Sequence, residues 1–145
     1  MTGWRTRWWC WLSVLWLGAA ALAQPALSTA DAEGIRSTVQ SQLSAMATGD
    51  AERAFALAAP GIRQQFGNAG AFMAMVRSAY PMVIKPSTTT FFVPVGATEG
   101  ASQQVRLVDA AGRLWLASYA LARQTDGTWR IAGCSVALDN ASHSI

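Results

Sequence analysis

Side chains that move protons in catalysis are few in this sequence of 145 residues, and their placement argues against an enzyme. The single histidine, His143, lies in a polar tail, where we expect it to be solvated. General acid–base catalysis needs a carboxylate or imidazole with a shifted pKa in a partly dry pocket. We therefore predict no catalytic residue. All eight acids fall instead at predicted helix starts, in turns or loops, or after the last strand: Asp31, Glu33, Asp50, Glu52, Glu99, Asp109, Asp126 and Asp139.

Metal and phosphate sites also lack their usual residue patterns. The sequence contains no Cys–His cluster, no H-E-x-x-H segment and no paired-carboxylate spacing that would hold a metal ion. It contains no glycine-rich loop of the kind that cradles a phosphate. We expect neither a bound metal nor any other cofactor.

Cys134 is the strongest candidate nucleophile. It follows Gly133 in a predicted strand, with Ala132 and Val136 as its neighbours on the same face. Apolar surroundings raise the pKa of a thiol and keep it inert. We predict a packed structural cysteine, and a redox role or a ligand contact is the alternative.

Five other side chains are candidates for a ligand pocket. Tyr80 and Tyr119 combine an apolar ring with a polar tip that orients a ligand, although either phenol can instead bond a backbone carbonyl from within the core. Arg77 offers charge to an anionic ligand at a cavity mouth, unless it is an ordinary exposed helix arginine. Phe72 and Trp115 would supply apolar wall.

Helical periodicity dominates the chain before Pro81. Apolar residues recur every three or four positions between Ser28 and Gly49, which predicts one amphipathic helix. Asp50 is the expected N-cap of a second helix that reaches about Ala59. A third helix is predicted over 69–79 and ends before Pro81, and 60–66 can form one further turn.

After Pro81 the apolar period changes from 3.6 to 2, which predicts four strands. Their links, 96–101, 109–112 and 126–127, are short and turn-forming, so consecutive strands are expected to be antiparallel neighbours. Three helices followed by a curved four-stranded antiparallel sheet make an α+β fold in which the sheet wraps the helices. The predicted strands span 87–95, 103–108, 114–123 and 128–138.

From their sequence, two of these strands are predicted to have no polar face. In 114–121, apolar residues occupy both alternate sets of positions, and in 128–138 Ile131 faces one way while Cys134 and Val136 face the other. A sheet that helices cover on one face only would then expose a large apolar patch. We therefore predict a homodimer joined through the outer faces of these strands, since two-fold pairs are the commonest oligomers.

Residues 1–23 have the three parts of a signal peptide: an arginine-containing start, an apolar run and an A-x-A end. Cleavage after Ala23 would leave a mature chain that begins at Gln24. An uncleaved anchor is the rival interpretation, but the 16 residues from Trp8 to Ala23 fall short of the roughly 20 that span a bilayer. We expect a secreted protein, periplasmic where the host has an outer membrane, with no stable membrane anchor after cleavage.

The mature chain would carry little charge and one thiol. The full sequence has a formal net charge of +3, and loss of Arg5 and Arg7 leaves nine basic residues against eight acidic. So small a charge argues against nucleic acid as a partner. Cys134 remains after Cys10 is removed, so packing rather than an intrachain disulfide must stabilise the domain. The expected organisation is a lead-in (24–30), a single domain (31–138) and a polar tail (139–145).

Four segments stand out as motifs: Gln65–Gly67 (QFG), Phe72–Pro81 (FMAMVRSAYP), Asp109–Trp115 (DAAGRLW) and Asp126–Cys134 (DGTWRIAGC). They resemble the motifs of a small bacterial family, domain of unknown function 4864, and the order of helices and strands is similar to the α+β cone of nuclear transport factor 2-like proteins. The resemblance covers roughly 35–138 and implies a cavity between the helices and the concave face of the sheet. The family implies no established activity, so no catalytic residue follows from it.

These observations favour a secreted, non-catalytic domain that binds a small apolar or amphipathic ligand, or a protein partner, through the cone. One alternative is a small isomerase- or hydrolase-like enzyme that uses Tyr80, Arg77 or Tyr119, and another is a structural module of the cell envelope. An acid or histidine in the cavity would favour the enzyme, a cavity filled by side chains the module, and an open apolar cavity the binder.

Overall fold

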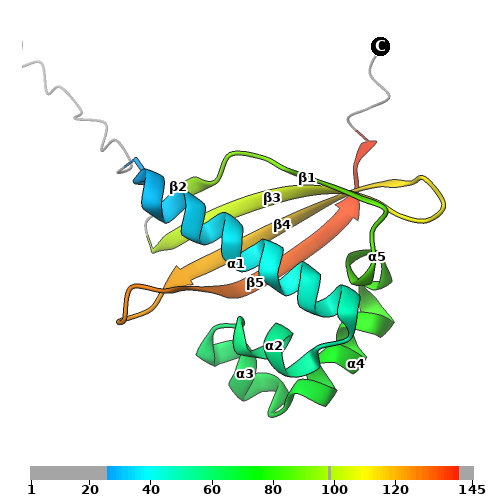
Figure 1. Ribbon diagram of the computed structural model, residues 1–145, viewed down its shortest axis with the longest axis horizontal. Helices are drawn as coiled ribbons and strands as arrows, with labels where there is room; N and C mark the ends of the chain where they lie inside the picture. The colour runs from blue at the N-terminus through cyan, green and yellow to red at the C-terminus, as the bar shows by residue number, and fades with distance from the viewer. Residues whose placement is uncertain (1–25, 98, 141–145) are drawn as a thin grey trace, which may run out of the picture.

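The computed structural model describes residues 26–97 and 99–140, in which five helices precede five strands (Figure 1). The predicted signal peptide, and His143 in the tail, lie outside the described residues. No helix in the described part is long and apolar enough to cross a membrane. The elements are α1 (Thr29–Thr48), α2 (Ala51–Ala56), α3 (Pro60–Phe66), α4 (Ala69–Ala79), α5 (Pro81–Ile84), β1 (Thr88–Phe91), β2 (Val95–Ala97), β3 (Gly100–Val108), β4 (Leu114–Arg123) and β5 (Trp129–Leu138).

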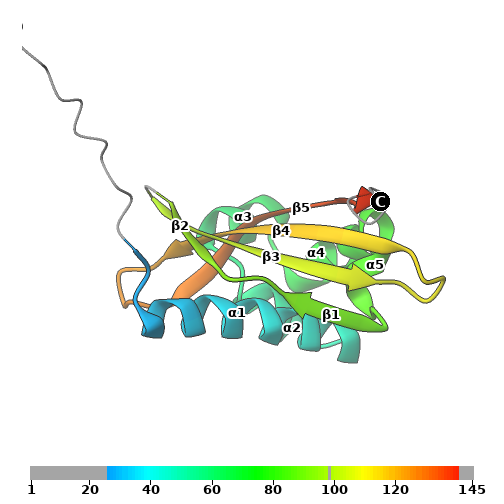
Figure 2. The ribbon, with the colours of Figure 1, turned by 90° about the horizontal axis from the view of Figure 1, so that it is seen from above.

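The first helix, α1, forms where the periodicity predicts it. Ser28 caps its start by accepting a hydrogen bond from the Asp31 N–H at 3.0 Å, and Gly49, with a φ of 74°, ends it in the left-handed region. Ile35 and Val39, on its inner face, are fully inaccessible to solvent. α1 lies alongside the sheet and packs on its concave face (Figure 2).

The four shorter helices follow the prediction except at the end of α2 and at Pro81. α2, α3 and α4 form at the predicted places, with Asp50 and Asn68 as the N-caps of α2 and α4, although α2 ends at Ala56 rather than Ala59. Pro81 does end α4, but it also begins the additional turn α5. Proline suits this first helical position because the missing N–H would have had no partner within the helix.

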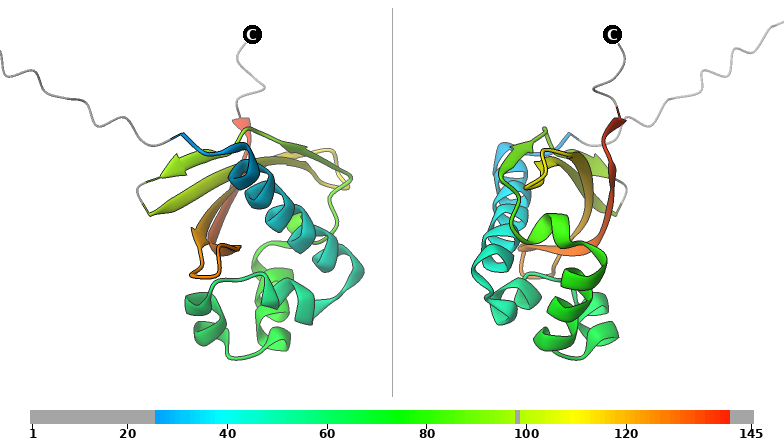
Figure 3. Two further views of the ribbon diagram at one scale, coloured as in Figure 1. Left: turned by 60° about the vertical axis from the view of Figure 1, so that its left-hand side comes forward. Right: turned by 90° about the vertical axis from the view of Figure 1, so that its right-hand side faces the viewer.

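The sheet is antiparallel and strongly curved, with the strand order β1-β3-β4-β5 (Figure 3). This arrangement confirms the predicted α+β fold. The first predicted strand, 87–95, is divided: β1 and β2 both pair with β3, and Phe92–Pro94 separates them. Gln103 of β3 stabilises the break between β1 and β2, because its side-chain Nε2 donates a hydrogen bond to the Phe92 carbonyl oxygen at 2.6 Å. The predicted loop 96–101 is consequently shorter, since β2 pairs with the start of β3.

A β-bulge in β5 decides which side chains face the helices. Ala132 has no partner on β4, so the register shifts between Ala120 and Leu121. The extra residue reverses the alternation of side chains, and Ile131 and Cys134 therefore face the same, concave side. The prediction that this strand is apolar on both faces is wrong. Beyond the bulge, the outer positions of β5 hold small residues: Gly133, Ser135 and Ala137.

The helical half of the chain is attached to the sheet at the beginning of β5. The indole N–H of Trp129 donates to the Asp31 carboxylate of α1 at 3.2 Å. The Ile131 N–H donates to the Leu57 carbonyl oxygen at 2.9 Å, and the Ala59 N–H donates to the Ile131 carbonyl oxygen at 2.7 Å. These contacts fix the helices against the concave face. The core between them contains fully buried side chains such as Ile35, Val39, Met73, Val105 and Leu107.

Candidate functional site

A pocket of about 490 Å³ lies between the helices and the concave face of the sheet. It is bordered by the C-terminal half of α1, by α3, α4 and α5, and by β4 and β5. Among the described residues, no charged side chain belongs to its lining, which is mostly apolar. Small-molecule sites in proteins have this character and volumes of about 300–1,000 Å³. The apolar walls include Met46, Phe66, Val83, Ile131 and Val136.

The helix side of the pocket is built around Phe72 of α4. Phe72 is 5% exposed, and its ring centroid lies 5.7 Å from the centroids of Phe55 and Phe66. Helical spacing places Phe72 and Val76 on the same inner face of α4. Tyr80, just after α4, is half-buried and borders the same space. Two sequence candidates, Phe72 and Tyr80, therefore line the pocket.

Tyr119 and Cys134 form the polar part of the sheet side, where they pair across β4 and β5. Tyr119 is 3% exposed, and burial, reinforced by the neighbouring Cys134, raises its pKa well above the ordinary value. Cys134 is exposed, so the prediction of a packed cysteine is wrong. Burial of its sulfur nevertheless raises the pKa of the thiol to about 11, against the opposing hydrogen bond from Tyr119. Both groups are neutral at physiological pH.

Two sequence candidates lie outside the pocket lining. Arg77 is exposed on α4 and does not border the pocket. Trp115 of β4 is half-buried, and its indole N–H donates to the Asp109 carboxylate at 2.9 Å. The structure therefore brings Phe72, Tyr80 and Tyr119 together and leaves Arg77 and Trp115 apart from them.

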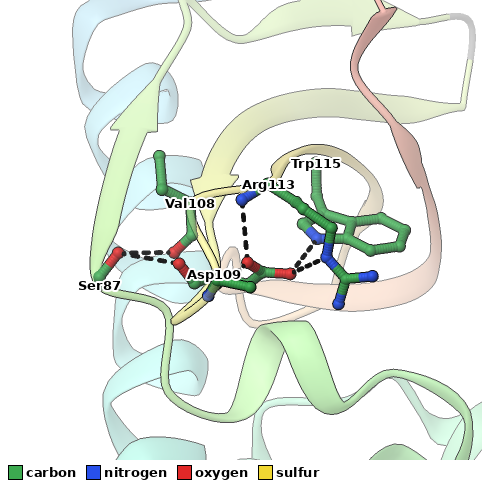
Figure 4. Close-up of polar contacts among 6 residues, drawn as sticks. Ser87, Val108, Asp109, Arg113 and Trp115 are labelled. Carbon is green, nitrogen blue, oxygen red and sulfur yellow. Dashed lines mark hydrogen bonds and ion pairs between the residues drawn. The ribbon is translucent and has the colours of Figure 1, made fainter.

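Asp109 organises the turn between β3 and β4 (Figure 4). Its carboxylate accepts hydrogen bonds from Trp115 Nε1 and from Arg113 Nε at 2.8 Å. It also accepts from the backbone N–H groups of Ala111 at 2.9 Å and Arg113 at 3.0 Å. These donors, the Trp115 indole foremost, lower the pKa of Asp109 to about 2. Asp109 is therefore a structural turn residue, and it is unsuited to proton transfer near neutral pH.

Gln42 of α1 is a pocket residue that the sequence reasoning missed. Its side chain is 3% exposed and borders the pocket, and its Nε2 donates to the Ala54 carbonyl oxygen at 3.1 Å. A glutamine in a helix usually indicates the solvent face. Its spacing carried the contrary signal, because Gln42 comes three residues after Val39 and four before Met46, which places it on the buried stripe.

Comparison with known proteins agrees with this architecture. A solved structure from Catenulispora Acidiphila in complex with S-DNPA has a similar fold, with a TM-score of 0.51 and 15% sequence identity, covering 79% of this chain and 98% of that one. No curated protein matches the chain. The family model described as domain of unknown function (DUF4864) matches residues 28–144, which confirms the family that the four motifs predict. The protein therefore belongs to the DUF4864 family.

Proposed function

We propose that the protein binds a small apolar or amphipathic ligand in this pocket and does not act as an enzyme. The observation that carries the proposal is the pocket of about 490 Å³, whose lining has no charged side chain among the described residues. Apolar ligand surface buried there would contribute roughly 25 cal/mol per Å². The similar structure from Catenulispora Acidiphila is a complex with S-DNPA, which supports a ligand-binding role for this fold.

The chemistry of the lining supports binding over an isomerase- or hydrolase-like reaction. Proton transfer is most efficient when the pKa of the catalytic group lies near the working pH. The pKa values of Tyr119 and Cys134 are both raised away from neutrality. Asp31, Asp109 and Asp126 have lowered pKa values and lie outside the pocket lining. Within the described part of the chain, no group of three or more His, Cys, Asp or Glu side chains gathers to hold a metal ion.

A fluorescent apolar probe tests this proposal. N-phenyl-1-naphthylamine titrated into the purified protein should bind saturably at one site. Val136→Trp places an indole in the pocket wall and should weaken the binding at least tenfold, because the side chain occupies ligand space. Val93→Trp is the matched control, since Val93 is 84% exposed, lies outside the pocket lining and should leave binding unchanged. Absence of saturable binding, or equal losses in both variants, would reject the proposal.

Export is the second part of the proposed role. The leader pattern of residues 1–23 supports a secreted protein whose mature chain begins at Gln24. Intact-mass measurement of the protein recovered outside the cytoplasm should give the mass of residues 24–145. Retention of residues 1–23 in that fraction would overturn it and favour an anchored protein.

A homodimer through the outer face of β4 and β5 belongs to the same proposal. Leu114 and Leu116 of β4 point to that face and are half-buried, with Arg106 of β3 beside them. Because these leucines, rather than Trp115, lie on the outer face in this register, we propose that they would meet the partner. Sedimentation at micromolar concentration should give a dimer that Leu116→Glu converts to a monomer. A wild-type monomer would reject the dimer without affecting the pocket.

A further inference from the structure

Gln42 is the feature of the pocket that apolar binding alone does not explain. It is 3% exposed, yet it lies among apolar side chains in the wall that α1 contributes. Burying a polar side chain is unfavourable unless its donors and acceptors have partners. The hydrogen bonds of its amide therefore decide what the pocket can recognise.

The orientation of the Gln42 amide follows from its one protein partner. Its Nε2 lies 3.1 Å from the Ala54 carbonyl oxygen, which can only accept a hydrogen bond, so the nitrogen and not the oxygen must face Ala54. The other end of the amide is the acceptor Oε1. Among the described residues, no group donates to this oxygen.

A second buried glutamine, Gln103, shows that an unpartnered amide oxygen can bind a ligand only where it borders the pocket. Gln103 Oε1 also has no partner among the described groups, but it is sealed from solvent and Gln103 does not border the pocket. Gln42 does border the pocket, and its Oε1, unlike that of Gln103, is not sealed from solvent, so a bound molecule can reach this oxygen. An acceptor that is withdrawn from bulk water and open to a ligand cavity selects a ligand with a hydrogen-bond donor.

The remaining polar groups narrow the ligand further. Besides Gln42, the lining contains the polar side chains of Gln65, Tyr80, Tyr119 and Cys134. Gln65 is exposed and Tyr80 is half-buried, so solvent reaches both residues, whereas Tyr119 and Cys134 are neutral and interact with each other. No lysine or arginine of the described chain lines the pocket. A carboxylate would bring a second acceptor toward Oε1 with no cation to pair with it. An ammonium group would find no carboxylate among the described residues of the lining. Both charged classes of ligand are therefore disfavoured.

We infer that the ligand is an uncharged amphipathic molecule whose polar end, a hydroxyl or amide N–H, donates a hydrogen bond to Gln42 Oε1, while its apolar body packs against Phe72, Ile131 and Val136. This inference rests on the proposed function, because it requires that the pocket binds a ligand. It adds the chemical class of that ligand and the residue that selects it.

Three probes of matched chain length test the assignment: 1-decanol, decyl methyl ether and decanoate at pH 7.5, each measured by displacement of N-phenyl-1-naphthylamine. The alcohol carries a donor, the ether lacks it and decanoate is charged. We expect the alcohol to bind roughly 5- to 10-fold more tightly than the ether, as one additional hydrogen bond predicts, and decanoate to bind most weakly.

Gln42→Met assigns the preference to the amide, because methionine keeps the length of the side chain and removes the acceptor. The alcohol-to-ether ratio should fall to about 1 in this variant. Gln40→Met, on the exposed face of the same helix, should keep the wild-type ratio. Because the readout is a ratio within each protein, loss of stability does not imitate the expected result, and the wild-type ratio is informative even if Gln42→Met does not fold.

The outcomes separate the two proposals. If the wild type binds none of the probes and no fluorophore, both the proposed function and this inference fail. If it binds alcohol and ether equally, or decanoate most tightly, the pocket stands and the inference is overturned. A preference for the alcohol that persists in folded Gln42→Met would likewise overturn the assignment to Gln42.

Discussion

Two sites on one strand, four residues apart, use the same concave face of β4 in opposite ways. At Trp115, the indole N–H, an arginine and two backbone N–H groups all converge on the Asp109 carboxylate. At Tyr119, the side chain borders a pocket in which the Gln42 oxygen has no partner among the described residues. The comparison indicates that satisfied polar groups hold the fold at one site, while at the other the apolar walls and the Gln42 acceptor suit the ligand that we propose.

The largest loss of stability is expected at Phe72, because its side chain contributes both to the core and to the pocket wall. Phe72→Ala removes ring contacts with Phe55 and Phe66 and should lower the free energy of unfolding by about 3 kcal/mol. Urea denaturation measures this loss. Phe92→Ala is the control, since Phe92 is 38% exposed and should change stability by less than about 1 kcal/mol. Equal effects would mean that the pocket wall does not contribute to the core.

The Asp109 turn should be the next most sensitive site. Asp109→Ala removes the shared acceptor and leaves the Trp115 indole N–H without its partner, so we expect Tm to fall by roughly 5 °C or more. Probe binding in the pocket should be unchanged below the melting range. Glu33→Ala, at an exposed position of α1, is the control and should shift Tm only slightly. A binding loss in folded Asp109→Ala would contradict the independence of the two sites.

Low pH should destabilise the folded protein by protonating the Asp109 carboxylate. The pKa of Asp109 is about 2 in the folded chain, below its ordinary value of 3.8. The stabilisation is therefore complete above about pH 4 and is lost as the pH falls through 2. Urea midpoints measured between pH 5 and pH 2 should fall less steeply in Asp109→Ala than in the wild type. Parallel curves would show that the turn does not hold this carboxylate ionised.

The reactivity of the Cys134 thiol tests the polar part of the pocket lining. The residue is exposed, but burial of its sulfur raises the thiol pKa to about 11 from 9.0, so at neutral pH labelling by iodoacetamide should be about 100-fold slower than for an ordinary thiol. The rate should rise with pH up to about 11. Tyr119→Phe should slow it further, because the phenol hydrogen bond lowers the thiol pKa. Rapid labelling of the native protein at neutral pH would contradict this account.

The smallest effect is expected at Arg77. It is exposed on α4 and lies outside the pocket lining. Arg77→Ala should change stability by no more than about 0.5 kcal/mol and leave probe affinity unaltered. A clear fall in affinity, measured by the same fluorescence titration, would extend the site to the outside of α4.

Local patterns predict the regular elements well. The apolar run 114–123 matches β4, and the helical stripe, Ser28 and Gly49 give α1 its boundaries. The divided first strand and the bulge depend on contacts made only in three dimensions: the Gln103 side chain bonds the Phe92 carbonyl, and Ala132 is looped out of the ladder. No local propensity encodes either contact, and the bulge alone reverses the faces of the residues that follow it.

Prediction of the pocket residues from the sequence has the same limit, because local patterns do not give the three-dimensional position of a side chain. Phe72, Tyr80 and Tyr119 were identifiable because aromatic residues near the junction of helix and sheet point to a cavity. Arg77 and Trp115 have side chains suited to a ligand site but lie outside the pocket lining, since the direction of Arg77 depends on the helix face and that of Trp115 on the Asp109 turn. Gln42 is a polar residue on an apolar stripe, and its type alone does not predict a pocket position. The orientation of its amide depends on the Ala54 carbonyl oxygen of a neighbouring helix.

Few buried side-chain contacts hold α3 to the rest of the fold, so α3 is where the proposed ligand would exchange with solvent. This helix contributes no fully buried side chain, although Ile62 and Phe66 border the pocket, and Ala59, just before it, is tied to β5 through a backbone hydrogen bond to Ile131. Local opening free energies are lowest where few buried contacts are broken. Amide hydrogens of α3 should therefore exchange with deuterium well before those of β4, and the proposed ligand would enter and leave through a partial opening that leaves the sheet intact.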